Sequence, residues 1–216
     1  MRQILAGINF IIASQKFNQR LMRVLLTGFE PFGGSDINSS WEAACRVRTQ
    51  SFEDIELDVR QISVSFRRVG EEIQGFLETE KPDVLVMLGQ RANSKTIDIE
   101  RIAINMMDAA KPDNDGFHPD EIAICEGGRA AYFSNLPVKR LKDVVLAKGI
   151  PSKVSNSAGL YVCNCAYYHA LKMVEDNGLD TKVVFVHVPK ISEEIDVEMI
   201  ADGVKEVIKC IKEIVL

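Results

Sequence analysis

Two residues of this chain stand where their side chains could act as a nucleophile and a base. Cys163 follows the turn-forming sequence SNSAG and begins a segment with helical apolar spacing. Unpaired backbone N–H groups and the positive dipole end of a helix start favour a thiolate, so we expect a lowered thiol pKa there. His187, near the end of the apolar run VVFVHVP, could be the base. The ordinary alternatives are a small packed residue for Cys163 and a core imidazole bonded to a carbonyl for His187.

The chain connection between these two residues favours chemistry over those alternatives. If residues 163–176 form a helix that joins one strand to a parallel neighbour at 182–188, the helix start and the strand end share one edge of the sheet. Sheets of this kind bind ligands at that edge. We therefore expect Cys163 and His187 to lie together in a site.

A third residue, a carboxylate, is needed to orient the imidazole. The strand predicted at 83–88 rises to the same edge, so the following loop lies there, and Glu100 at the start of the next strand stays close. Asp98 and Asp108 are rivals on geometry. The pattern ranks Glu100 only slightly ahead of them.

The loop 27–34, TGFEPFGG, follows the first predicted strand and reaches the same edge. It lacks the glycine spacing and the lysine of a phosphate-binding loop. Phe29 and Phe32 could be core residues, or they could wall an apolar pocket for a small flat ring. The two thiols of the C-x-C sequence diverge by about 200° on a helix, and no His/Cys pair stands at ligand spacing, so we expect no metal and no cofactor.

The elements that must position these residues alternate between strands and helices, which predicts an α/β chain. We expect a three-layer α/β/α sandwich around a twisted, largely parallel mixed sheet. Apolar runs predict strands, and spacing near 3.6 residues predicts helices. The strands are expected at 23–29, 55–64, 81–90, 99–109, 152–155 and 182–188, and the helices from 39 or 40 with Ser39 or Ser40 as the cap, and at 66–79, 137–148, 163–176 and 194–215.

The composition limits the classes of partner. The chain has 216 residues, a net charge of −5 and five cysteines. An acidic chain without a basic cluster is not expected to bind nucleic acid, and an odd cysteine count in a chain of this length favours a reducing, cytoplasmic setting. The apolar run near the start is too short to span a membrane. We expect residues 1–21 to be an extension outside the fold, and residues 22–216 to form a single domain.

Several motifs together resemble the pyroglutamyl peptidases, a family of cytoplasmic cysteine peptidases. The resemblance covers residues 22–216, and the motifs stand in the family's order and spacing. They are TGFEPFGG, INSSWEA, IERIAIN, PDNDG, AYFSNLPVK, SNSAGLYVCN and FVHVP. Family membership implies a peptidase that removes N-terminal pyroglutamate from small peptides, and a homo-oligomer of two or four subunits.

The resemblance also implies a role for each site residue. It places the nucleophile at Cys163, the general base at His187 and the orienting acid at Glu100. It places the pocket for the pyroglutamyl ring at Phe29, Phe32, Gln90, Tyr161 and Val162. Tyr161 stands where family members commonly have Phe.

One segment departs from the family pattern. Members often have the sequence G-x-A-G-G-R, with an arginine near the catalytic thiol, whereas this chain has GQRANSK from Gly89. Ser94 occupies the arginine slot, and Arg91 and Lys95 are expected to be displaced from it. The missing arginine gives an alternative hypothesis, a catalytically weak homologue that binds pyroglutamyl peptides. A nucleoside- or phosphate-handling enzyme of related architecture is disfavoured, because the chain lacks a phosphate loop and the basic residues of such a site.

Overall fold

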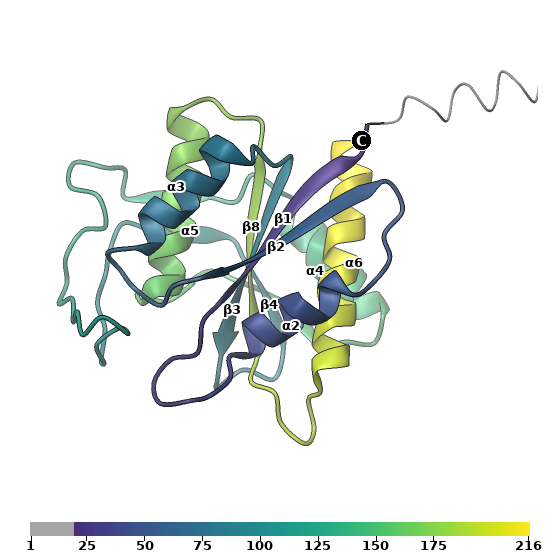
Figure 1. Cartoon of the computed structure of the whole chain (residues 1–216), viewed down its shortest axis with the longest axis horizontal. Helices are drawn as coiled ribbons and strands as arrows, with labels where there is room; N and C mark the ends of the chain where they lie inside the picture. Colours follow the sequence, from purple (N-terminus) through teal and green to yellow (C-terminus); the bar gives the residue numbers. More distant parts are fainter. Residues whose placement is uncertain (1–19) are drawn as a thin grey trace, which may run out of the picture.

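A computed structural model describes residues 20–216 (Figure 1). The predicted extension at residues 1–21 falls almost entirely outside the described residues. The strands are β1 (Met22–Phe29), β2 (Ile55–Ile62), β3 (Val84–Arg91), β4 (Ile97–Glu100), β5 (Ile102–Ile104), β6 (Ala131–Phe133), β7 (Ser152–Ser155) and β8 (Lys182–Pro189). The helices are α2 (Ser39–Arg48), α3 (Val69–Thr79), α4 (Val138–Ala147), α5 (Val162–Asp176) and α6 (Val197–Val215).

Six of these strands form the main sheet, in the order β2-β1-β3-β8-β4-β7. The four strands β2, β1, β3 and β8 are parallel to one another, while β4 is antiparallel to β8 and β7 is parallel to β4. Strands β5 and β6 form a separate antiparallel pair. The prediction of a largely parallel mixed sheet is confirmed.

Helices cover both faces of the sheet, which confirms the three-layer prediction (Figure 1). Side chains alternate between the faces along each strand. On β3, Leu85 and Met87 pack in the core beneath α3 and α5, while Val84 and Val86 pack in the core beneath α2, α4 and α6. Strands buried on both faces are therefore continuous apolar runs, as in VLVML and VVFV.

The long C-terminal helix α6 belongs to the second of these layers. Asp196 caps its first turn by accepting a hydrogen bond from the backbone N–H of Met199. Ile200, Val204 and Ile208, on one face of this helix, are fully buried against the sheet and the neighbouring helices. Among residues 20–216, no helix is long and apolar enough to cross a lipid bilayer.

Three local predictions need correction. The N-cap of α2 is Asn38, whose side chain accepts from the N–H of Ser40, rather than Ser39 or Ser40. The segment 99–109 is not one strand, because β4 ends at Glu100 in the main sheet and β5 begins at Ile102 in the other. The strand before α5, β7, is neither parallel nor adjacent to β8, since β4 lies between them.

Candidate active site

Cys163 is the second residue of α5 and lies at the carboxyl end of the parallel strands, as predicted. Its sulfur sits over Gly89 at the end of β3, so close that a Cβ built on Gly89 would come within 2.9 Å of it. Gly89 pairs in register with His187 on β8. Cys163 and His187 therefore lie at the same end of the sheet, as predicted. The prediction assumed that the strand before α5 is a parallel neighbour of β8, which is wrong. The outcome is unaffected, because the positions of the two residues depend only on α5 and β8.

Cys165 is directed elsewhere. It is almost fully buried, and its sulfur faces the backbone carbonyl of Phe66 at 3.9 Å. The two thiols of the C-x-C sequence thus diverge as helix geometry requires. In the described part of the chain, no group of three or more His, Cys, Asp or Glu side chains is arranged to hold a metal ion.

His187 and Glu100 form a direct contact. His187 Nδ1 lies 2.7 Å from Glu100 Oε1, and the two side chains are 4% and 0% exposed. This contact makes Nδ1 the protonated nitrogen of a neutral ring, which leaves Nε2 as the free base. Glu100 is the last residue of β4, not near the start of a strand as the sequence indicated.

The two rival carboxylates are placed differently. Asp98 pairs in register with His187, yet its carboxylate is directed to Arg91, Thr96 and Lys153. The side chain of Asp108 makes no hydrogen bond or ion pair with the described residues, and only its backbone N–H is bonded, to Leu160. Of the three candidates, Glu100 is the one in contact with the imidazole.

Arg91 at the end of β3 reaches the same cluster. Its Nη2 lies 2.9 Å from Glu100 Oε1, and its Nη1 lies 2.8 Å from Asp98 Oδ2. Arg91 therefore reaches the site from its own position in the sequence, although it does not occupy the family's arginine slot. Lys95 does lie apart, in an exposed pair with Glu194.

A cavity of about 280 Å³ opens beside Cys163 and His187. All five residues predicted to bind the ring line it, namely Phe29, Phe32, Gln90, Tyr161 and Val162. This volume lies at the lower end of the range for small-molecule sites, so it suits a small ligand group. Most of its exposed lining is apolar, with polar groups at a few points.

The two phenylalanines of the cavity differ in burial. Phe29 is only 2% exposed and its ring packs 6.4 Å from that of Phe185, so it belongs to the core as well as to the wall. Phe32 is only partly buried, and its ring lies 6.2 Å from that of Tyr161. Phe29 is therefore both a core residue and part of the cavity wall, the two alternatives that the sequence left open.

The polar groups of the cavity are fixed by backbone contacts. Gln90 Oε1 accepts a hydrogen bond from the N–H of Ser39, which leaves the amide nitrogen as the end of that side chain able to donate to a ligand. The hydroxyl of Tyr161 donates to the carbonyl of Pro112, and burial raises the pKa of this phenol to about 12. Its oxygen is thus tied to the PDNDG loop.

Further polar contacts hold the loops around the cavity together. Asn38 donates to the carbonyl of Glu30, and Asn114 donates to the side chain of Glu30 and the carbonyl of Pro31. Asp113 accepts from the N–H groups of Phe66, Asp115 and Phe117. The PDNDG and TGFEPFGG motifs are therefore bound to each other.

The protonation of the two reactive groups follows from their burial. Burial raises the pKa of the Cys163 thiol to about 12, against a smaller lowering by Arg91. This reverses the lowered value expected from the helix start, because desolvation of the packed sulfur outweighs the helix end. Burial also lowers the pKa of His187, against the raising effect of Glu100. At neutral pH the site therefore holds a thiol and a neutral imidazole.

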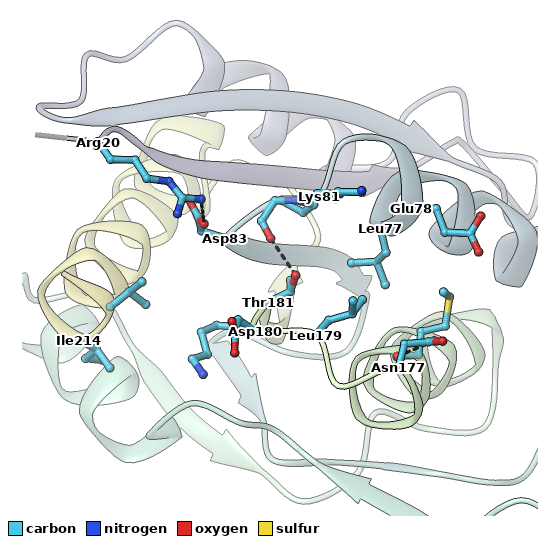
Figure 2. Close-up of a pocket in the computed structure, with 14 residues that line it drawn as sticks. Arg20, Leu77, Glu78, Lys81, Asp83, Asn177, Leu179, Asp180, Thr181 and Ile214 are labelled. Atoms are coloured by element: carbon cyan, nitrogen blue, oxygen red, sulfur yellow. Dashed lines mark hydrogen bonds and ion pairs between the residues drawn. The ribbon is translucent and has the colours of Figure 1, made fainter. Parts of the chain in front are cut away.

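A larger cavity, about 790 Å³, lies at the opposite edge of the sheet (Figure 2). There Arg20 forms an ion pair with Asp83, and the hydroxyl of Thr181 donates to the carbonyl of Pro82. Its lining contains no cysteine or histidine. Size alone would favour this cavity, but the smaller one holds the nucleophile and the base.

Sequence reasoning missed three residues that line the smaller cavity and could bear on its chemistry: Arg91, Asn38 and Asn93. The N-cap preference for Asn pointed to Asn38, at the turn before α2. The contacts of Arg91 with Asp98 and Glu100 had no local signal in the sequence, because these partners stand on a strand that is two places away in the sheet.

Comparison with known proteins connects this site to a family. A sequence model of the pyroglutamyl peptidases matches residues 22–212. The pyrrolidone-carboxylate peptidase of Thermococcus onnurineus is 44% identical over 173 residues, which cover 80% of this chain and 86% of that protein. The corresponding protein of Clavibacter michiganensis is 43% identical over 171 residues, covering 79% of this chain and 80% of its own length.

Solved structures agree with the sequence comparison. Pyroglutamyl peptidase I from Bacillus amyloliquefaciens is 31% identical and superposes with a TM-score of 0.84, covering 88% of this chain and 94% of its own. A mutant pyrrolidone carboxyl peptidase from Pyrococcus furiosus is 36% identical with a TM-score of 0.86, covering 90% of this chain and all of its own. The resemblance inferred from the motifs is confirmed.

Proposed function

The chain belongs to the pyroglutamyl peptidase family, a family of cysteine-type peptidases, and from this premise we propose that it removes N-terminal pyroglutamate from small peptides. The observation that carries the proposal is that Cys163 and His187 both line a small, largely apolar cavity, while Glu100 contacts the imidazole of His187. We assign these three residues as nucleophile, general base and orienting acid.

The mechanism starts from the neutral pair. As the thiol of Cys163 attacks the pyroglutamyl carbonyl carbon, Nε2 of His187 takes its proton, so the raised thiol pKa is overcome only when the substrate is in place. Glu100 accepts from Nδ1 and stabilises the imidazolium that forms. The negative oxygen of the tetrahedral intermediate is stabilised by N–H groups at the start of α5, each worth on the order of 3 kcal/mol.

Collapse of the intermediate completes the first half of the reaction. The carbon–nitrogen bond breaks, the leaving amine takes the proton from His187, and a thioester joins Cys163 to the pyroglutamyl group. Water, activated by the same imidazole, then attacks the thioester. Free pyroglutamate leaves, and the proton returns to the sulfur.

The cavity supports selection of a neutral ring. Phe32 and Tyr161 give apolar and aromatic surface, and the free amide nitrogen of Gln90 can donate to the lactam carbonyl. A glutamate side chain would bring a negative charge into this cavity, where Arg91 is already paired with Asp98 and Glu100, and a buried charge without a partner is costly. The group expected to bind in the cavity is therefore the lactam ring of pyroglutamate and not the open-chain glutamate.

The setting and assembly remain parts of the proposal. All five cysteines are free thiols, which supports a reducing compartment such as the cytoplasm. The family resemblance further predicts a dimer or tetramer. Light scattering of the purified protein measures that number directly.

Hydrolysis of a chromogenic pyroglutamyl amide tests the function. The prolyl amide is the substrate control, because it keeps the five-membered ring but lacks the ring carbonyl and so carries a protonated amine in place of the neutral lactam. We expect release of the chromophore from the first and at most a trace from the second. Cys163→Ser should abolish hydrolysis with the fold retained, while Cys165→Ser should keep most of the activity. Activity that survives Cys163→Ser would refute the mechanism. Binding of the pyroglutamyl amide without turnover by the unmodified protein would favour the weak homologue instead.

A further inference from the structure

The guanidinium of Arg91 lies between two carboxylates that are fully buried. Asp98 and Glu100 are both 0% exposed and stand two residues apart on β4, on the face that His187 shares. Arg91 contacts one with each terminal nitrogen, and its side chain is itself 28% exposed. Two negative charges buried this close repel each other unless a cation separates them.

The two carboxylates differ in how much they depend on Arg91. Asp98 also has Thr96 and Lys153 as partners. Glu100 has only two partners among the described side chains, His187 and Arg91, and both contact the same oxygen, Oε1. Its other oxygen, Oε2, is buried with no hydrogen-bond partner in the described part of the chain. Among the side chains of residues 20–216, Arg91 is therefore the one arginine or lysine in contact with the carboxylate that orients the imidazole.

The arrangement of strands explains how Arg91 reaches this carboxylate. Gly89 and Arg91 are two residues apart on β3, so their side-chain positions share the face covered by α5. Strand β8 lies between β3 and β4, and His187 on β8 pairs with Gly89 on one side and with Asp98 on the other. The arginine extends across β8, and Nη2 is fixed further by donating to the carbonyl of Ser157.

We propose that Arg91 is a positioning residue for the reaction: its guanidinium holds the Glu100 carboxylate in place, directed at Nδ1 of His187. This inference rests on the proposed function, because it assigns the partner of the general base. It implies that Arg91 sustains turnover through Glu100 and His187 rather than by contact with the peptide.

A matched pair of variants isolates this role. Arg91→Gln and Lys153→Gln each remove one positive charge that contacts Asp98, but only Arg91 also contacts Glu100. Lys153 is 57% exposed and does not line the cavity. Arg91→Lys serves as the conservative variant, because an ammonium group keeps the charge but cannot contact both carboxylates in a planar fork.

The first measurement needs no substrate. The chain has three histidines, so ¹⁵N-histidine NMR can follow the Nδ1 proton of His187, assigned with a His187→Gln sample. We expect the unmodified protein and Lys153→Gln to show His187 in the Nδ1–H form with a downfield, slowly exchanging proton. Arg91→Gln should lose that signal, and Arg91→Lys should retain a weaker one.

The second measurement is the division between kcat and KM on the pyroglutamyl amide. Misplacement of a catalytic group by about 1 Å can cost about a hundredfold in rate, so we expect Arg91→Gln to lower kcat by about tenfold to a hundredfold with KM within about twofold. Arg91→Lys should fall between it and the unmodified enzyme. Lys153→Gln should stay within about twofold in both constants.

Two outcomes would overturn the inference. One is an Nδ1 proton and a kcat that are both unchanged in Arg91→Gln, whether or not its thermal stability falls, and the other is a rise in KM alone. If Arg91→Gln fails to fold, Arg91→Lys provides the test. An unchanged Nδ1 signal and an unchanged kcat in Arg91→Lys would show that the paired contacts of the guanidinium with Asp98 and Glu100 are not needed. A protein inactive on every pyroglutamyl substrate would refute the proposed function, while the NMR comparison would still test the contact between Arg91, Glu100 and His187.

Discussion

At the scale of single residues, the neutral thiol and imidazole make a prediction about pH. Because burial raises the pKa of Cys163 to about 12, the fraction of reactive thiolate should increase with each unit by which the pH rises, up to that value. Alkylation of Cys163 by iodoacetamide, followed by mass spectrometry of its peptide, should accelerate about tenfold per pH unit between pH 7 and 10. A small cysteine peptide, whose thiol pKa is about 8.5, should reach its plateau within this range.

The pKa of His187 gives a second prediction, for how kcat/KM changes as the pH falls. Only neutral His187 can take the proton, and burial lowers its pKa below the usual value near 6.5. The value of kcat/KM should therefore hold as the pH falls through 6.5 and decline only below it. A labelling rate that is flat from pH 7 to 9 would mean that a preformed thiolate–imidazolium pair is present, which would contradict this assignment.

The two phenylalanines of the cavity separate binding from stability. Phe32 is partly exposed at the cavity, so Phe32→Ala should raise KM and lower kcat/KM by about tenfold, equivalent to about 1.4 kcal/mol. Phe29 is also part of the core, so Phe29→Ala should lower the free energy of unfolding by about 3–5 kcal/mol. Steady-state kinetics and chemical denaturation of both variants check this. The division fails if Phe32→Ala unfolds the protein or leaves the kinetics unchanged.

Sequence predicted some residues of this site and not others, for a physical reason. The positions of Cys163 and His187 depend only on a helix start and the end of the next strand, and both have local signals. The contact between Arg91 and Glu100 depends on β8 lying between β3 and β4, and strand order is a long-range property. The thiol pKa was predicted in the wrong direction because the helix start is visible in the sequence, while the packing of the sulfur on Gly89 is not.

At the scale of the elements, the close approach of α5 to β3 depends on Gly89. A Cβ at this position would lie 2.7 Å from the ring of Phe185 and 2.9 Å from the sulfur of Cys163, so one of them must move. Gly89→Ala should lower kcat by about a hundredfold with the far-UV circular dichroism spectrum unchanged.

Gly75 on α3 offers the matched control, because a Cβ there would meet no atom within 4 Å. Gly75→Ala should leave the kinetics unchanged and stabilise the fold by up to about 1 kcal/mol, since alanine is the better residue inside a helix. Full activity in Gly89→Ala would show that the sulfur can move without loss, and the tight contact would then have no catalytic importance.

The strand predicted at 99–109 is wrong because the chain passes from one sheet to the other between two short strands, β4 and β5. The segment from Ile99 to Ile104 is apolar except for Glu100 and Arg101, so the pattern indicates one strand. The chain instead leaves the main sheet at Arg101, whose N–H donates to Ser155 and whose carbonyl accepts from Ser134. Periodicity records which residues are buried but not which sheet buries them.

At the scale of the whole molecule, the folded unit is predicted to need nothing before Met22. This residue begins β1, and the family match also begins there. Truncation to residues 22–216 removes the ion pair between Arg20 and Asp83 from the described part of the chain. The side chain of Arg20 is 75% exposed in this pair. Asp83 keeps the backbone N–H of Arg23 as a partner.

An exposed ion pair contributes about 0–1 kcal/mol, and about 1 kcal/mol corresponds to about 2–4 °C in Tm for a domain of this size. The truncated protein should therefore melt within about 4 °C of the full chain and have the same kcat/KM. Arg20→Ala in the full chain measures the ion pair alone. If truncation lowers Tm by much more than Arg20→Ala does, the segment before Met22 contributes stability of its own, and the domain boundary assigned here is wrong.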